Sequence, residues 1–196
     1  MNLDSFALCR PFPGEAQSGD LAVIEQHGEQ LFLGLIDVAG HGPKAHALAV
    51  ECGEYLRSHL LDEDLTGLLQ GLHRHIRYSR GAVAGLALLD ASSGELNFAG
   101  VGNIYACTLG RAGRTLISRS GLLGQIMPSV RQEHTRLRLG ELLVLCSDGV
   151  HSRDLETLFT NTKGGDAKNI ATELVERFGK DTDDASCIVV RRGAAA

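Results

Sequence analysis

Short apolar runs, many with alternating polar residues and most bounded by glycine, proline or other turn residues, make up most of the 196-residue chain. This pattern predicts β-strands, because successive side chains of a strand point to opposite faces and strands in globular proteins are short. The strands that we expect are residues 5–9, 21–26, 31–37, 81–89, 95–99, 104–109, 115–119, 130–137, 142–146 and 186–191.

In three places the apolar residues instead recur with the period of a helix. After Pro43, which suits the first turn of a helix, apolar residues repeat every four positions. The residues of this repeat are Leu48, Cys52, Leu56 and Leu60. A second helix is expected over 65–76 with Asp64 as its N-cap, and a third over 170–178 that ends at Gly179.

The order of these elements indicates the fold class. Strands come first, then two helices, a long series of strands, a helix and a last strand, which is typical of an α+β protein. We therefore expect a mostly antiparallel sandwich with helices packed outside. No linker, repeat or low-complexity stretch divides the chain, so residues 1–193 are expected to form one domain, followed by a short tail over 194–196.

Composition narrows the functional classes. Apolar residues make up 43% of the chain, which excludes a disordered or fibrous protein. A net charge of −5 with scattered basic residues argues against binding to nucleic acid. Neither a membrane-spanning run nor a signal peptide is recognisable. The five cysteines show no CxxC spacing, so we expect reduced thiols in a cytoplasmic protein, and neither disulfides nor zinc.

Aspartates at strand ends are the candidate functional groups. Asp20 follows Ser-Gly before a strand, Asp37 and Asp148 follow two long apolar runs, and Asp183 and Asp184 precede the last strand. A carboxylate at a strand end is held by rigid backbone and still reaches solvent, as a site for a hard divalent cation requires. Each aspartate alone could simply be a turn former, but their joint occurrence favours a metal site.

The motifs SGD, DVAGHG, AGVGNI, SDGV and DDAS occur in this order between about Asp20 and Arg191. Together they resemble the signatures of PPM-type metal-dependent serine/threonine phosphatases, in particular those of the bacterial SpoIIE branch. The resemblance implies an αββα sandwich of two mostly antiparallel sheets flanked by helices. It also implies two Mn²⁺ or Mg²⁺ ions and attack on the phosphate by a water molecule that bridges them.

The same resemblance assigns roles to single residues. Asp37 corresponds to the aspartate that contacts both ions, and it is a catalytic candidate together with Asp148. Asp184 stands where relatives carry Asp or Asn, and we expect it to support the ligands from behind. The metal ligands implied by the resemblance are Asp20, Asp37, the carbonyl of Val38, Asp148 and Asp183.

Two positions depart from the pattern of eukaryotic relatives. Those relatives carry a histidine two places after the bridging aspartate, proposed as a general acid, where this chain has Ala39. His41 lies two residues further on and is expected to shape the turn or to act from behind the metal site. The relatives also hold phosphate with an arginine near the N-terminus, and Arg10 is the nearby candidate, at a different spacing from Asp20. Asn103, which follows Gly102, is interpreted as part of a tight turn.

Within the SpoIIE branch, a domain of this length resembles the feedback phosphatases of the stressosome. This implies a phosphorylated STAS-domain protein as substrate. The loop 121–130 is a candidate contact for that protein, because it carries apolar residues between two strands. Leu123 and Met127 would make the contact, and the alternative is that both belong to the core.

Two other functions remain open on sequence grounds. The first is a pseudophosphatase that keeps the fold and acts as a binding module, although all four ligand-type aspartates are retained. The second is an ATP-binding domain of the GHKL kinase type, in which an asparagine-bearing helix precedes a DxxGxG motif. Here strands precede Asp37 and a helix follows it.

Overall fold

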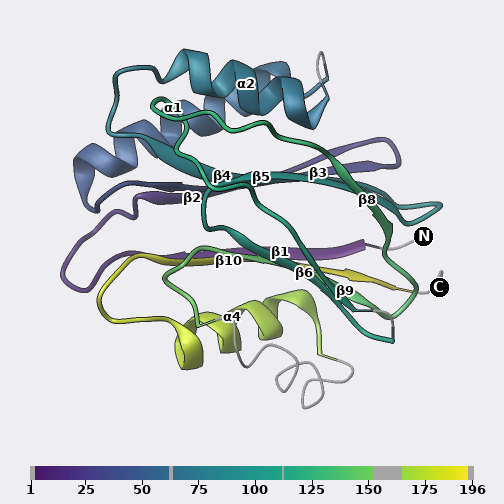
Figure 1. Cartoon of the computed structure of the whole chain (residues 1–196). Coiled ribbons are helices and arrows are strands. Elements are labelled where there is room, and N and C mark those ends of the chain that lie inside the picture. Colours follow the sequence, from purple (N-terminus) through teal and green to yellow (C-terminus); the bar gives the residue numbers. More distant parts are fainter. Residues whose placement is uncertain (1–2, 62–63, 112, 152–164, 194–196) are drawn as a thin grey trace.

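The computed structural model describes residues 3–61, 64–111, 113–151 and 165–193. Two five-stranded sheets face each other, and all neighbouring strands in them run antiparallel. Helices α1 (Pro43–His59) and α2 (Leu65–His75) cover the outer face of one sheet, and α4 (Ala167–Phe178) covers the outer face of the other (Figure 1). The expected αββα sandwich is confirmed.

The first sheet has the strand order β1–β10–β9–β6–β7, and the second has the order β2–β3–β4–β5–β8. The strands of the first sheet are β1 (Leu3–Arg10), β10 (Ala185–Arg192), β9 (Leu142–Cys146), β6 (Tyr105–Leu109) and β7 (Arg114–Leu116). Those of the second are β2 (Asp20–His27), β3 (Gln30–Val38), β4 (Ala82–Asp90), β5 (Glu95–Val101) and β8 (Glu133–Arg136). Every expected strand is present, with ends that differ by at most three residues.

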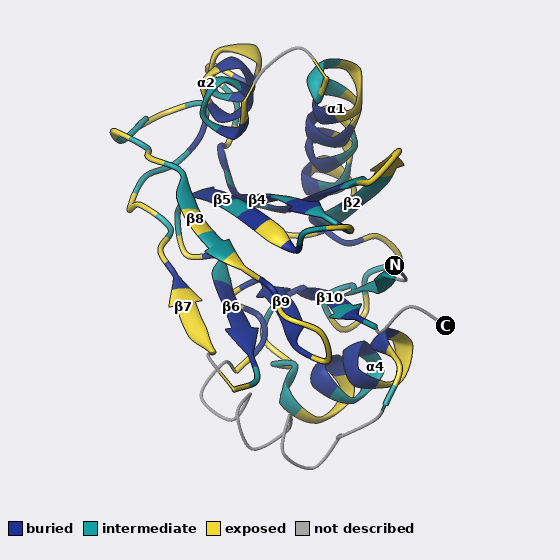
Figure 2. Cartoon of the chain, turned by 90° about the vertical axis from the view of Figure 1, so that its right-hand side faces the viewer, coloured by how far each residue is buried: buried dark blue, intermediate teal, exposed yellow. Residues whose placement is uncertain are grey.

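Three apolar layers hold the sandwich together (Figure 2). Strand β3 shows the principle: Leu33 and Leu35 face the other sheet, whereas Phe32 and Ile36 face the helices. A strand that is buried on both faces needs an apolar residue at nearly every position, which explains the uninterrupted run before Asp37. The third layer lies between α4 and the first sheet.

Helices α1 and α2 begin as the sequence predicts, whereas α4 begins three residues earlier than expected, after its N-cap Asp166. Pro43 occupies the first turn of α1, and the Asp64 side chain accepts a hydrogen bond from the Gly67 backbone nitrogen at 2.7 Å. The unfavourable Gly71 inside α2 has a packing reason. A Cβ atom there would lie 2.1 Å from the Tyr55 hydroxyl oxygen, so only glycine lets the two helices approach this closely.

In the described part of the chain, no helix combines the length and the hydropathy needed to cross a membrane. All five cysteines are free, and four of them are buried. Burial raises the pKa of the Cys52 thiol to about 12, so this side chain behaves as a small apolar group rather than as a nucleophile.

The loop 121–130 requires a correction. Leu123 pairs with Ala82 through two backbone hydrogen bonds, and its side chain is completely buried beneath α1 and α2. Met127 packs against the same apolar cluster. The structure therefore places Leu123 in the core, whereas Met127 is partly buried at the edge of the same cluster. The large apolar side chain that this loop does expose is Ile126, at 68% of its surface.

Leu123→Ser should lower the free energy of unfolding by about 3 kcal/mol, because it removes a buried side chain and buries a hydroxyl in its place. Ile126→Ser, in the same loop, should change it by no more than about 0.5 kcal/mol. Urea denaturation of both variants measures the difference. Equal stability of the two would show that Leu123 is not a core residue.

Candidate metal centre

The candidate aspartates come from the ends of strands in both sheets. Asp20 on β2 lies directly opposite Asp37 on β3 in the antiparallel register. Asp148 lies in the turn after β9, and Asp183 lies in the turn before β10. Because β2 and β3 belong to the second sheet and β9 and β10 to the first, the four carboxylates meet where the two sheets meet.

A pocket of about 240 Å³ lies between these strand ends. Asp37, Asp148 and Asp183 line it together with Asn103 and the backbone of the DVAGHG loop. Asp20 lies deeper and is 4% exposed, and its Oδ2 atom has no hydrogen-bond partner within the described residues. A buried carboxylate oxygen without a partner is costly unless a cation accompanies it.

The electrostatics of the cluster show an excess of negative charge. Burial raises the pKa of Asp20 to about 7, and the carboxylates of Asp184 and Asp183 add to the effect. Burial also raises the pKa of Asp37 to about 8, with further contributions from Asp20, Asp148, Asp183 and Asp184. Burial disfavours the ionised form of both carboxylates and the neighbouring carboxylates disfavour it further, and a bound cation would offset both effects.

The donor set fits a hard divalent metal. Every candidate side-chain ligand is a carboxylate, and oxygen ligands of this kind suit Mg²⁺ and Mn²⁺. In the part of the chain that the structure describes, no three His, Cys, Asp or Glu side chains are yet arranged so that they could hold an ion. Asp37, Asp148 and Asp183 nevertheless line one pocket, where a bound cation would bring their carboxylates closer together. Val38 is buried beside Asp37 at the end of β3, where its expected ligand carbonyl lies.

Asp184 has a different position from Asp183. It is 3% exposed and accepts hydrogen bonds from the backbone nitrogens of Phe12 at 2.7 Å and Gly19 at 2.8 Å. It therefore fixes the turn that carries Asp20 and does not line the pocket. Gly19 is required in this turn, because a Cβ atom there would lie 2.8 Å from the Gly40 carbonyl oxygen.

Neither His41 nor Arg10 lines the pocket. The His41 ring stacks on Phe12 with 4.3 Å between ring centroids, and its Nδ1 atom lies 3.2 Å from a Glu15 carboxylate oxygen. Arg10 donates a hydrogen bond to the Lys180 carbonyl and lies 3.9 Å from the Asp181 carboxylate. Both side chains thus support the loops around the site.

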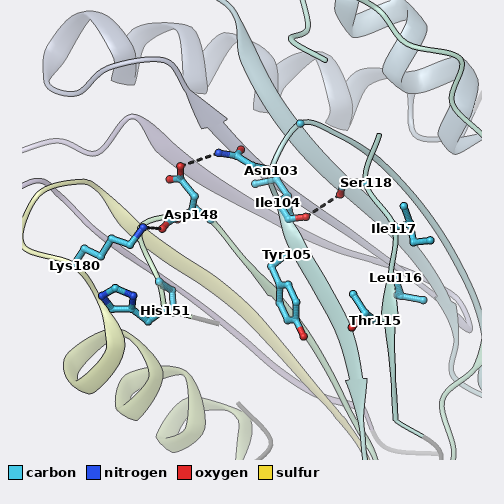
Figure 3. A pocket seen from close by; sticks show the side chains of 13 residues that line it. Asn103, Ile104, Tyr105, Thr115, Leu116, Ile117, Ser118, Asp148, His151 and Lys180 are labelled. Atoms are coloured by element: carbon cyan, nitrogen blue, oxygen red, sulfur yellow. Dashed lines mark hydrogen bonds between the residues drawn. The ribbon is translucent and has the colours of Figure 1, made fainter. Parts of the chain in front are cut away.

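Asn103 is a site residue that the sequence interpretation missed. Its Nδ2 atom donates a hydrogen bond to Asp148 Oδ2 at 2.8 Å, while the Lys180 ammonium donates to the Asp148 carbonyl oxygen (Figure 3). Gly102 has a φ of 97°, but it connects β5 of one sheet to β6 of the other, so the chain forms a bend between the sheets and not the expected tight turn. This bend brings Asn103 to Asp148. The signal was available, since Asn103 belongs to one of the motifs that carry the family resemblance.

A larger groove of about 720 Å³ adjoins the pocket and shares Asn103 and Asp148 with it. Tyr105 and Ile117 form part of its apolar wall, and Lys180 lies on the side of the metal centre (Figure 3). The groove leaves room beside the carboxylates for a ligand much larger than phosphate.

The comparison with protein families decides the identity of this site. Residues 27–193 match the family model for Stage II sporulation protein E (SpoIIE). The chain belongs to the SpoIIE family. Members of this family have the metal-dependent PP2C fold, PP2C being another name for the PPM type, so the protein is a serine/threonine protein phosphatase. This assignment excludes the ATP-binding alternative. None of the curated proteins matches the chain significantly.

Solved structures agree with this assignment. One, described as "The bacterial stressosome: a modular system that has been adapted to control secondary messenger signaling", is 27% identical, with a TM-score of 0.90 over 97% of this chain and 100% of that chain. RsbX in complex with magnesium is 16% identical, with a TM-score of 0.85 over 96% and 94% of the two chains. The PP2C domain and a regulatory fragment of SpoIIE from Bacillus subtilis are 21% identical, with a TM-score of 0.85 over 97% and 63%. The last two similarities show the fold.

The raised pKa values of Asp20 and Asp37 predict how the thermal stability of the metal-free protein depends on pH. The folded state holds protons on Asp20 and Asp37 up to about pH 7 and 8, whereas the unfolded chain releases them near pH 3.8. Their contribution to stability is complete below the unfolded pKa and is lost as the pH rises through the folded pKa. The melting temperature in EDTA should therefore fall as the pH rises from about 4 to about 8.

Saturating Mg²⁺ should reduce this fall, because the cation favours the ionised carboxylates. Asp37→Asn should also flatten the profile in EDTA, since it removes the group with the higher pKa. Calorimetric melting curves across the pH range provide the measurement. A melting temperature that rises with pH in EDTA would contradict the buried, uncompensated cluster.

Proposed function

We propose that the protein dephosphorylates phosphoserine or phosphothreonine on a STAS-domain protein of a stressosome, in the cytoplasm, in a role like that of RsbX. Two Mn²⁺ or Mg²⁺ ions would be held by Asp20, Asp37, the Val38 carbonyl, Asp148 and Asp183. The observation that carries the proposal is the cluster of strand-end carboxylates around one pocket, two of them with pKa values near neutrality.

The chain supplies position and charge rather than a nucleophile. Within the described residues, the pocket is lined by no serine, threonine, cysteine or histidine side chain. Cys146 is fully buried, and burial keeps the pKa of its thiol well above the usual value. Ser147 is 1% exposed. Hydroxyl, thiol and imidazole groups that could form a phosphoenzyme intermediate are therefore absent from the described lining of the pocket, and attack by a water molecule is the route that the family resemblance implies.

A pair of divalent ions held by these carboxylates would supply positive charge for the phosphate and would lower the pKa of a bound water molecule. The backbone holds two of these carboxylates in place. Asp37 lies at the end of a strand that is buried on both faces, and Asp20 lies opposite it in the sheet. Asn103 restrains the most exposed ligand, Asp148, through its hydrogen bond. Restraining a ligand in this way keeps the donor set ready for the metal.

Two similarities to solved structures support a stressosome protein as the substrate. The structure that is 27% identical over the whole chain comes from work on the bacterial stressosome, and RsbX shares the fold and almost the whole length of the chain. The groove beside the pocket offers space for the polypeptide that flanks a phosphorylated residue.

Hydrolysis of p-nitrophenyl phosphate and of a phosphorylated STAS-domain protein should cease in EDTA and return with Mn²⁺. Asp37→Ala should lower kcat on both by roughly a thousandfold, because its carboxylate is the one expected to contact both ions. Steady-state kinetics of wild type and variant measure this. Asp181→Ala is the matched control, since its side chain is 90% exposed and lies outside the pocket.

Full turnover on either substrate after exhaustive chelation would exclude the metal mechanism. Activity on p-nitrophenyl phosphate without activity on the STAS-domain phosphoprotein would leave the phosphatase intact and reject the proposed substrate.

Alanine substitutions of the neighbouring residues Asp183 and Asp184 should have different effects, the first on activation by the metal and the second on thermal stability. Asp183→Ala should abolish activation by Mn²⁺ with little change in melting temperature, because Asp183 lines the pocket and is only half-buried. Asp184→Ala should mainly lower the melting temperature, since it leaves the Phe12 and Gly19 amides without an acceptor. Asp184→Asn keeps one acceptor oxygen and should restore part of the loss. If Asp184→Ala abolished activation by Mn²⁺ and Asp183→Ala mainly lowered the melting temperature, the roles assigned to these two residues would have to be exchanged.

A further inference from the structure

The turn between α2 and β4 carries a concentration of positive charge that the metal centre does not explain. No acidic residue occurs between Asp64 and Asp90, although the chain as a whole has a net charge of −5. Within residues 73–80, which we call the basic turn, five of the eight residues are histidine or arginine. They are His73, Arg74, His75, Arg77 and Arg80.

The arginines of the basic turn are available to a partner. Arg74, Arg77 and Arg80 are exposed, and none of them forms an ion pair with a carboxylate of the described residues. His75 differs, because its Nε2 atom lies 3.1 Å from Glu51. Burial lowers the pKa of His73, and the charges of Arg77 and Arg74 lower it further, as expected for cations without counter-charge.

Stabilisation of the helix explains only part of this charge. Basic residues in the last turn of a helix interact favourably with its dipole, which accounts for the residues up to His75. Arg77 and Arg80 lie beyond the end of α2, where the dipole effect falls off. The helix dipole therefore does not account for Arg77 and Arg80.

The backbone at the tip of the basic turn is strained. Tyr78 has a φ of 68°, the one positive φ of a non-glycine residue within the described parts of the chain, and it is 92% exposed. A bulky side chain rarely adopts this conformation, and such strain persists where surrounding contacts impose it. Here the Ser79 nitrogen bonds to the Ile76 carbonyl at 3.2 Å, and the Gln125 side chain donates to the Arg80 carbonyl at 3.0 Å. The strain holds an aromatic ring in solvent with the Arg77 guanidinium 5.5 Å from its centroid.

Arg80 connects the basic turn to the metal pocket. Its Nη1 atom donates a hydrogen bond to the Ala39 carbonyl at 3.0 Å and lies against Gly40. Ala39 and Gly40 line the pocket of the aspartates. On the other side, the Gly124 nitrogen donates to His73 Nδ1 at 3.1 Å, so the turn is held between this loop and the pocket rim.

We propose that the basic turn docks an acidic segment of the phosphoprotein substrate, next to the phosphorylated residue. This inference rests on the proposed phosphatase function and specifies the substrate class. Arg80 is closest to the pocket and would contact the phosphate or the residue beside it, while Arg77 and Arg74 would attract carboxylates further along. The exposed Tyr78 ring offers an apolar contact between these charges. Complementary charge of this kind gives specificity and speeds association.

Two synthetic phosphoserine peptides of equal length, one with acidic and one with basic flanking residues, test the proposal. The wild-type protein with Mn²⁺ should show a kcat/KM about tenfold higher for the acidic peptide at low salt, and high salt should reduce this preference. The double variant Arg74→Glu/Arg77→Glu should abolish or reverse the preference. Each rate is divided by the rate of the same variant on p-nitrophenyl phosphate, which removes effects on the metal centre.

Arg111→Glu is the matched control, because Arg111 is equally exposed but follows the opposite end of β6 from the metal centre. It should leave the peptide preference unchanged. Tyr78→Gly is a second variant that cannot fail by misfolding at this turn, because glycine adopts a positive φ without strain. It should keep or raise the melting temperature while lowering the rate on the acidic peptide.

Equal kcat/KM for the two peptides, or the same change from Arg111→Glu as from the double variant, would overturn the docking proposal. In both cases the phosphatase itself remains active. A wild-type protein that hydrolyses neither the peptides nor p-nitrophenyl phosphate would reject the proposed function instead, so the two failures are distinguishable.

Discussion

The antiparallel register of β2 and β3 places Asp20 directly opposite Asp37, and the metal centre depends on this pairing. A shift of one residue would turn every side chain of one strand to the other face of the sheet. Such a shift is prevented because β3 is buried on both faces, so Leu33 and Phe32 could not exchange layers without losing their packing. The apolar run before Asp37 therefore has two functions: it forms the core, and it fixes the depth at which the carboxylate lies.

The site couples the two sheets through polar contacts, and the buried carboxylates that it brings together cost stability in the metal-free protein. Asp184, before β10, binds the backbone of Gly19, before β2, so the strand ends of both sheets are held together behind the pocket. This brings Asp20 near other carboxylates and leaves one of its buried oxygens without a partner. The three apolar layers offset the cost, and a bound cation would remove much of it. Stability and metal affinity are thus linked through the same carboxylates.

The sequence predicted the strands well because each one is bounded by turn residues and has an apolar pattern set by its burial. It also located the strand-end aspartates, since these follow directly from the strand boundaries. It did not reveal the hydrogen bond from Asn103 to Asp148, because the two residues are far apart in sequence and meet only through the pairing of β6 with β9. Leu123 was ambiguous for a related reason: whether an apolar loop residue is buried depends on a backbone pairing with Ala82 that no local pattern encodes. The positive φ of Tyr78 is likewise imposed by distant contacts.

Recognition of a phosphoprotein by an acidic enzyme poses a problem of range. The net charge of −5 repels a phosphorylated, acidic segment, and near physiological salt this interaction is screened beyond a Debye length of about 8–10 Å. Cations that help such a substrate must therefore lie within that distance of the reacting phosphate. Arg80 satisfies this condition because it bonds to the loop that lines the pocket, whereas scattered surface lysines would not. Specificity then depends on the cations at the rim of the metal pocket. The net charge of the whole chain has only a general effect on association.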